Sequence, residues 1–151
     1  MRTMLLSSES AFCKVSPVKD DISVTVIDKE TCPRYLGHYV YDVQNVETPL
    51  WMKRRLIAVG HNAISAMVDI TNYVLVEIGQ PMHAFDLSTL EGSSIVVRRA
   101  EEGEKLTTLD EKERVLTSNN LLICDKVKGV GLAGVMGGLN SEIKDTTTEV
   151  L

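Results

Sequence analysis

Alternation of apolar and polar residues near the start of the chain predicts β-strands. Residues 22–27 alternate isoleucine and valine with serine and threonine, and residues 35–43 repeat a β-rich pattern with one interruption, at Gly37. Residues 1–21 mix serine, lysine and aspartate without a sustained period. We therefore predict a lead-in or linker over residues 1–21 and one folded domain over residues 22–151.

A first helix is predicted after these strands. Thr48 is a favoured N-cap residue, Pro49 suits the first helical position, and Gly60 supplies the end of the helix. One apolar face is expected to comprise Leu50, Trp51, Arg54 and residues 56–59. Trp51 and Phe85 each lie inside an apolar pattern, so both are interpreted as anchors in the core and not as base-stacking platforms.

A second helix is expected to begin at Asp69 or Thr71 and to end at Gly79. His83 then falls in a turn just after the helix. With this start, Thr71 and Asn72 would stand at the open end of the helix, where free N–H groups can receive a carbonyl or phosphate oxygen. A helix-starting role for the pair is an equally good interpretation, because threonine and asparagine side chains compete for those N–H groups.

The second half of the chain has the pattern of short β-strands. The predicted strands cover residues 94–99, 105–109, 113–116 and 121–124, with a hairpin turn at 110–112. Residues 128–138 hold five glycines, but they lack the G-x-G-x-x-G order of a dinucleotide site and the Lys-Ser/Thr ending of a P-loop. A tightly packed strand and turn is the favoured interpretation of this glycine-rich run.

Composition restricts the class of protein. Apolar residues make up 44% of the chain and charged residues 25%, which are ordinary values for one globular domain. The net charge of −5 argues against a free-standing nucleic-acid binder, so other parts of a protein would have to hold any RNA partner. The basic groups at residues 53–55 and 98–99 are interpreted as solvated faces.

The cysteines and the short apolar runs of the chain indicate a protein of the reducing cytoplasm. The three cysteines are odd in number and lack paired metal-ligand spacing, so no disulfide framework and no metal site is expected. The apolar run at the N-terminus is too short for a signal peptide, and no run approaches the roughly eighteen apolar residues of a membrane helix.

Candidate chemistry centres on His83. Asp86 lies three residues further on and could orient the imidazole, but no serine or cysteine nucleophile can be placed against the pair, so a triad hydrolase is not supported. Backbone N–H groups exposed by the glycines of residues 131–138 could polarise an ester carbonyl.

Three motifs together carry a resemblance to a known family. Cys32-Pro33-Arg34-Tyr35-Leu36-Gly37, the stretch from Thr71-Asn72-Tyr73-Val74 to Gln80-Pro81-Met82-His83-Ala84-Phe85-Asp86, and the run from Gly131 to Gly138 occur in order. In this combination the chain resembles the B3/B4 domain of the bacterial phenylalanyl-tRNA synthetase β chain. In that family the domain is the editing module, which hydrolyses tyrosine mistakenly attached to tRNA(Phe).

The resemblance implies a fold and a site. The implied fold is an α+β domain with a curved, partly barrel-like mixed sheet, helices packed on one side, and an editing pocket between the helical and β parts. The implied catalytic residues are His83, which would position a water, and Asn72, which would orient the ester or amino group. The implied substrate-binding residues are Thr71, Ala84, Ala133, Gly134 and Gly137.

The resemblance also implies partners. They are the tRNA(Phe) 3′ end carrying tyrosine, the remainder of the β chain, and the α chain, with no membrane and no DNA. No metal or cofactor is expected in this domain, since ATP and Mg would serve the full enzyme.

Two departures from the family pattern bear on the prediction. The family's tyrosine-reading glutamate is expected just beyond Leu151, and His61-Asn62 stands where many members carry an arginine. The chain is therefore expected to be a fragment that lacks part of the site. A free-standing trans-editing factor and a non-catalytic RNA-binding or structural module are the alternatives.

Overall fold

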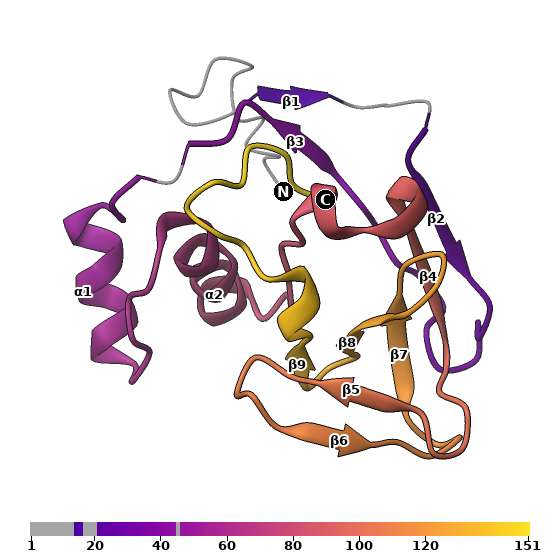
Figure 1. Ribbon diagram of the computed structural model, residues 1–151. Coiled ribbons are helices and arrows are strands. Elements are labelled where there is room, and N and C mark those ends of the chain that lie inside the picture. Colours follow the sequence, from indigo (N-terminus) through magenta and orange to yellow (C-terminus); the bar gives the residue numbers. More distant parts are fainter. Residues whose placement is uncertain (1–13, 17–20, 45) are drawn as a thin grey trace.

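Two helices lie beside a mixed β-sheet in the computed structural model, which describes residues 14–16, 21–44 and 46–151 (Figure 1). The predicted lead-in over residues 1–21 lies mostly outside the described residues and stays a prediction. Among the described residues, neither helix is long and apolar enough to cross a membrane. The arrangement confirms the α+β prediction.

The main sheet has five strands in the order β2-β4-β7-β8-β9. These strands are β2 (Ser23–Val26), β4 (Ser94–Arg99), β7 (Leu121–Cys124), β8 (Gly129–Leu132) and β9 (Met136–Gly137). Only β2 and β4 pair in parallel; the other neighbours are antiparallel, so the sheet is mixed as predicted. The predicted strands over residues 94–99 and 121–124 are confirmed.

Two small antiparallel sheets complete the β structure. One pairs β1 (Lys14–Ser16) with β3 (Tyr39–Tyr41), and the other is the hairpin of β5 (Lys105–Thr107) and β6 (Glu113–Val115). The predicted hairpin turn at 110–112 is confirmed, with Glu111 at φ 60° in the place where a glycine would be usual. The sheets do not close into a barrel within the described part of the chain.

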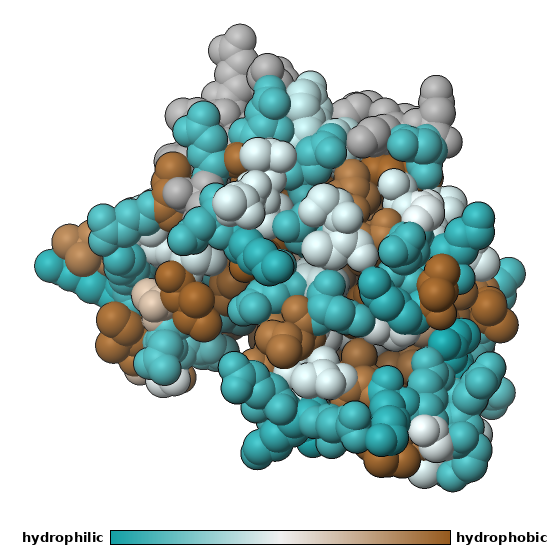
Figure 2. Space-filling model, viewed as in Figure 1, coloured by the Kyte–Doolittle hydropathy of each residue, from teal (hydrophilic) through white to brown (hydrophobic). Residues whose placement is uncertain are grey.

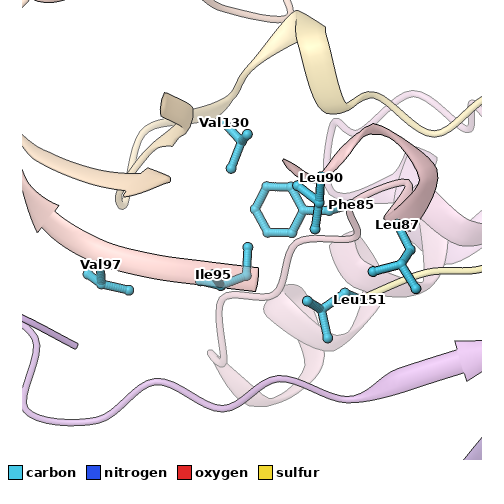
Figure 3. Close-up of a cluster of buried hydrophobic side chains, with 7 residues drawn as sticks. All are labelled: Phe85, Leu87, Leu90, Ile95, Val97, Val130 and Leu151. Atoms are coloured by element: carbon cyan, nitrogen blue, oxygen red, sulfur yellow. The ribbon is translucent and has the colours of Figure 1, made fainter. Parts of the chain in front are cut away.

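Two clusters of buried side chains form the core. The larger one, shown in Figure 3, contains Phe85, Leu87, Leu90, Ile95, Val97, Val130 and Leu151. The second, between the main sheet and the β5–β6 hairpin, contains Ala100, Leu106, Leu116, Leu122 and Cys124. Phe85 is 2% exposed, which confirms its predicted place in the core.

Helix α1 (Leu50–Ala58) buries less of its surface than its sequence predicts. Only Met52 and Leu56 are buried, whereas Trp51 is 52% exposed and Ile57 is 62% exposed. The predicted apolar face is therefore wrong. Because α1 packs mainly on α2 and stands beside the sheet in Figure 1, only a narrow stripe of its side chains is covered.

Thr48 links the helices instead of capping α1. The N-cap is Pro49, which offers no side-chain hydrogen bond, while the Thr48 hydroxyl donates to Oδ2 of Asp69. The other oxygen of this buried carboxylate accepts the Ile64 N–H at 2.8 Å. The predicted cap is wrong: Pro49 takes the N-cap position, and the Thr48 side chain is directed to the buried carboxylate of Asp69.

Helix α2 (Ala66–Ile78) begins earlier than predicted, after Ser65. Thr71 and Asn72 therefore lie in the middle of the helix, and the prediction that they stand at its open end is wrong. The predicted end is confirmed: Gly79 adopts the left-handed conformation at φ 72°, and its N–H donates to Leu75 O at 2.9 Å.

Residues 147–151 form a segment that bridges two distant parts of the chain through backbone hydrogen bonds. On one edge Val40 and Val150 exchange backbone hydrogen bonds of 2.9 and 2.8 Å. On the other edge Phe85 and Leu151 exchange bonds of 3.0 and 3.1 Å. The segment therefore fixes the backbone just after His83.

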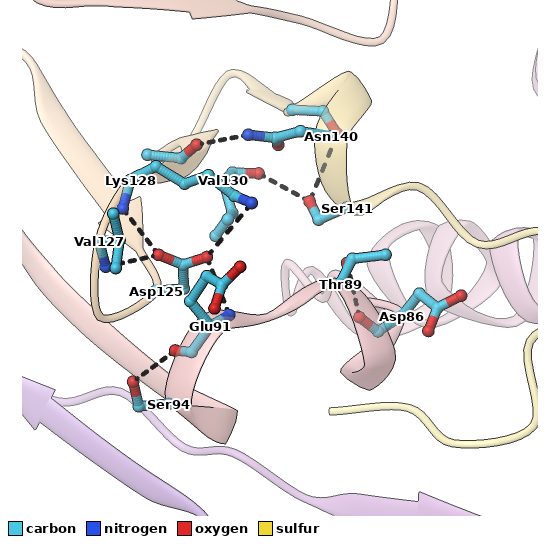
Figure 4. A network of polar contacts seen from close by, with 12 residues as sticks. Asp86, Thr89, Glu91, Ser94, Asp125, Val127, Lys128, Val130, Asn140 and Ser141 are labelled. Atoms are coloured by element: carbon cyan, nitrogen blue, oxygen red, sulfur yellow. Dashed lines mark hydrogen bonds and ion pairs between the residues drawn. The ribbon is translucent and has the colours of Figure 1, made fainter.

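Three short 3-10 turns complete the fold: η1 (Leu87–Thr89), η2 (Glu91–Ser93) and η3 (Leu139–Ser141). Figure 4 shows the polar contacts that hold two of them. Asp125, after β7, accepts hydrogen bonds from the N–H groups of Val127 at 2.7 Å and Glu91 at 3.1 Å. The Ser141 hydroxyl donates to Val130 O at 3.1 Å. These contacts tie η2 to the turn between β7 and β8, and η3 to β8 itself.

Candidate active site

His83 lies in the loop between α2 and η1. Its ring packs edge-on against Phe85, with 4.6 Å between ring centroids and 66° between ring planes. Phe85 is immobilised by the core and by its backbone pairing with Leu151. One side of the imidazole is thus supported by a rigid wall, while the residue remains exposed to solvent on another side.

Gly137 of β9 lies directly against the imidazole. A Cβ at this glycine would stand 2.3 Å from His83 Cε1 and 2.5 Å from Nε2, which is closer than atoms can approach. Only a glycine backbone leaves room for the ring in this position. The fold therefore brings together two residues that the sequence analysis selected from different motifs.

Leu109 is a neighbour of the site that sequence reasoning missed. Its N–H donates to Gly137 O at 3.1 Å, and its Cδ1 would lie 3.2 Å from a Cβ at Gly137. It follows β5, so the β5–β6 hairpin reaches the same edge of β9 as His83. A strand-end leucine carries no distinguishing signal in the sequence, because its place depends on how the hairpin folds over the sheet.

The environment of His83 favours the neutral imidazole. Burial of the ring atoms lowers the pKa of His83 below its ordinary value of 6.5. Within the described residues, neither ring nitrogen has a hydrogen-bond partner. A neutral imidazole with an open nitrogen can accept a proton or a hydrogen bond from a water.

Asp86 serves the fold and does not orient the imidazole. Its carboxylate accepts hydrogen bonds from the Ser88 N–H at 3.0 Å, the Ser88 hydroxyl at 2.7 Å and the Thr147 hydroxyl at 2.6 Å. Burial opposes ionisation, but these hydrogen bonds outweigh it and lower the pKa of Asp86 below its ordinary value of 3.8. Both carboxylate oxygens are engaged, so the predicted pairing with His83 is not formed.

Thr71 and Asn72 lie half-buried on α2. The Thr71 hydroxyl donates to Val68 O at 2.8 Å, one helical turn back. The Asn72 amide makes no hydrogen bond to another described residue, so its donors and acceptor are open to a ligand. No hydrogen bond or ring contact between described residues joins either side chain to His83.

Among the described contacts, none joins the imidazole to Ala133 or Gly134. Ala84 is half-buried beside His83 in the chain. Ala133 and Gly134 form the turn between β8 and β9, which a Val135 N–H to Leu132 O bond of 3.1 Å closes and which places Gly134 at φ 71°. The Gly134 N–H donates to no described residue, so this exposed turn offers one open backbone donor.

The cavity nearest to the hairpin lies apart from these residues. It has a volume of about 370 Å³ and opens between β5 and β8, where Lys105, Lys128 and Asn140 line it. None of the predicted site residues lines it. His83 itself is exposed, with Phe85 and Gly137 against its ring.

Comparison with known proteins identifies relatives. Residues 31–151 match the family described as the B3/4 domain. The chain is 54% identical over 129 residues to the phenylalanine–tRNA ligase beta subunit of Syntrophus aciditrophicus, covering 85% of this chain and 16% of that protein. The corresponding subunit of Oleidesulfovibrio alaskensis is 52% identical over 130 residues, which cover 86% of this chain and 16% of that protein. The subunit of Geobacter sulfurreducens is 52% identical over 135 residues, which cover 89% of this chain and 17% of that protein. The chain thus spans about one sixth of the length of these relatives.

Proposed function

Because the chain belongs to the B3/4 domain family, we propose that it acts as the editing module of a phenylalanine–tRNA ligase β subunit. In this proposal the substrate is tRNA(Phe) that carries tyrosine at its 3′ end, and the reaction is hydrolysis of the ester. The remainder of the β chain and the α chain would hold the tRNA, since an acidic chain with a net charge of −5 is a poor phosphate binder by itself. The reaction as proposed uses no metal or cofactor in this domain.

The contact of His83 with Gly137 is the observation that carries the proposal. It joins the histidine motif to the glycine-rich motif at a single point that is open to solvent on one side. Burial lowers the pKa of His83, so its imidazole is mostly neutral near pH 7. A neutral imidazole at the surface is suited to positioning a water, which is the role proposed for it.

The proposed reaction is a direct attack of water on the tyrosyl ester. The open nitrogen of His83 holds the water and takes one of its protons as the water oxygen bonds to the carbonyl carbon. The open N–H of Gly134 is proposed to stabilise the negative charge that develops on the carbonyl oxygen. The bond from that carbon to the ribose oxygen then breaks, and the imidazole returns the proton to the ribose oxygen.

The other predicted residues are proposed to place the substrate. The Asn72 amide, which has no partner among the described residues, would orient the ester or the amino group of tyrosine. Thr71, Ala84 and Ala133 would line the region that the amino acid occupies. Discrimination against phenylalanine is proposed to rest on the tyrosine hydroxyl, because a site built to pair that group leaves polar atoms unpaired with phenylalanine.

The test is a comparison of two substrates. We expect a complete synthetase that contains this domain to deacylate tRNA(Phe) charged with tyrosine faster than the same tRNA charged with phenylalanine, with the rate rising with protein concentration. Release of labelled amino acid over time measures both rates. Equal rates for the two esters, or rates no faster than in buffer, would contradict the proposal for this chain.

The pH dependence of the rate follows from His83. The base form of an imidazole whose pKa lies below 6.5 predominates at pH 7, so the tyrosyl-ester rate should be flat near neutrality. Below the lowered pKa it should fall about tenfold per pH unit as the ring takes up a proton. Rates measured at short times between neutral and mildly acidic pH test this. A rate that rises on acidification would contradict the role of a neutral His83.

A further inference from the structure

Trp51, the only tryptophan in the chain, lies on the surface of α1. Its 52% exposure contradicts the sequence interpretation of a core anchor. An indole that is half exposed to water lacks the stabilisation that burial would provide. A tryptophan held at the surface by its neighbours therefore needs a reason other than core packing.

Contacts from both helices hold the indole in place. Tyr73 of α2 meets Trp51 edge-to-face, with 5.3 Å between centroids and 90° between planes. The Arg55 guanidinium lies 5.4 Å from the Trp51 ring and 5.9 Å from the Tyr73 ring, and it donates a hydrogen bond to the Tyr73 hydroxyl. That hydroxyl in turn donates to Glu77 at 3.1 Å. The two rings therefore form an ordered cluster that spans the helix pair.

Helix α1 is basic, although the whole chain is acidic. Helix α1 contains Lys53, Arg54 and Arg55 and no acidic residue. Lys53 pairs with Glu47 at 2.6 Å, whereas Arg54 is exposed and makes no ion pair with any described residue. Figure 2 shows hydrophilic and apolar side chains next to one another over the two helices.

We infer that Trp51, Tyr73 and Arg55 form a stacking platform for single-stranded RNA. A nucleobase would lie on the exposed indole, and the neighbouring phosphates would lie near Arg54. Aromatic rings beside arginine bind unpaired bases in this way without reading their sequence. The inference rests on the proposed function for its choice of RNA, and it adds a site outside the His83 region.

RNA fits this cluster better than a polypeptide does. Exposed aliphatic side chains such as Ile57 and Ile78 also lie on the two helices, and they would suit a protein partner. A protein partner, however, would have to cover the exposed guanidinium groups of Arg54 and Arg55 and remove their water at a large cost. A phosphate backbone neutralises those charges directly. Tyr73 follows Asn72 on α2, so a strand stacked on the platform would run along the helix that carries a proposed site residue.

The fluorescence of Trp51 gives a direct test, because no other tryptophan contributes. A short single-stranded RNA ending in CCA should quench the emission of the intact chain, and a dye-labelled form of the same RNA should show the binding by anisotropy. Trp51→Ala should weaken the binding roughly tenfold or more, whereas Trp51→Phe, which keeps a ring, should weaken it less. Arg55→Gln should also weaken it. Lys112→Gln, an equal change of charge on the exposed turn of the β5–β6 hairpin, should have little effect.

Several results would overturn the platform. They are no binding of the RNA, binding without quenching, or equal affinity in Trp51→Ala. Sedimentation that shows self-association relieved by Trp51→Ala would assign the surface to a second copy of the chain and would also overturn it. Thermal melts of each variant check that the fold is retained.

Failure of the platform is distinguishable from failure of the proposed function. Quenching of Trp51 without tyrosyl-ester hydrolysis would keep the platform and remove the editing proposal for this chain. Hydrolysis that is unchanged in Trp51→Ala, with no RNA bound at the indole, would keep the editing proposal and remove the platform.

Discussion

Replacing Gly137 with alanine is expected to lower the rate of tyrosyl-ester hydrolysis about a hundredfold, close to the loss caused by His83→Ala. The added methyl group would overlap the imidazole at 2.3 and 2.5 Å, so the ring must leave its position against Phe85. A base that is displaced from the attacking water accepts its proton little better than if the base were absent. Initial rates of deacylation for the two variants and the unsubstituted chain measure the effect.

Gly131→Ala is the matched control for this experiment. Gly131 pairs with Gly137 across β8 and β9, yet a Cβ on Gly131 would meet its nearest neighbours at 3.8 Å, which is ordinary contact. We expect this variant to keep most of its activity and both variants to melt as cooperative folded proteins. Full activity in Gly137→Ala, or an equal loss in Gly131→Ala, would mean that the position of the His83 ring does not limit the reaction.

Asp86→Ala is expected to reduce the free energy of unfolding by about 3 kcal/mol, because hydrogen bonds to a buried carboxylate are stronger than neutral ones and their donors would be left unpaired. The donors are the Ser88 N–H and hydroxyl and the Thr147 hydroxyl. The folded-state pKa of Asp86 is lowered, so its contribution to stability should be present above the unfolded value of 3.8 and should be lost as the pH falls below that value. Urea denaturation at neutral and acidic pH measures both effects.

Substitutions at Thr147 separate this contact from general damage to the core. Thr147→Ser keeps the hydroxyl, which donates to Asp86 and accepts the Lys144 N–H, whereas Thr147→Val keeps the shape and removes both hydrogen bonds. We expect the valine variant to be the less stable of the two and the difference to shrink at low pH. Equal stability of the two variants at neutral pH would show that the Asp86 to Thr147 bond contributes nothing.

Local patterns in the sequence predicted the strands better than the helices. The strand over residues 94–99 is confirmed to the residue, because alternation and burial act within the segment itself. The end of α2 is confirmed because Gly79 alone supplies the left-handed conformation. The start of α2 and the cap at Thr48 were wrong because Asp69, a residue with a strong local capping preference, is buried and bonded to groups outside the helix.

In the candidate site, too, local motifs identified the residues but did not predict which of them are in contact. The histidine and the glycine were each selected from a motif, but their contact depends on how β9 lies against the loop after α2. No spacing along the chain specifies that contact. The exposure of Trp51 was missed for a related reason: an apolar pattern shows that a face is apolar and does not show whether the rest of the fold covers it.

The bridging segment of residues 147–151 has a consequence for the order of folding. It is hydrogen-bonded to Val40 on one edge and to Phe85 on the other, so it closes two long loops of chain at once. Contacts between residues so distant in sequence form late and slow the folding rate, because loop closure costs entropy before the contacts can compensate. During synthesis the ribosome adds residues 147–151 long after the loop that carries His83 has emerged. The backbone beside His83 therefore gains these partners only after residues 147–151 have been made, and a nascent chain has every candidate site residue before it has this support.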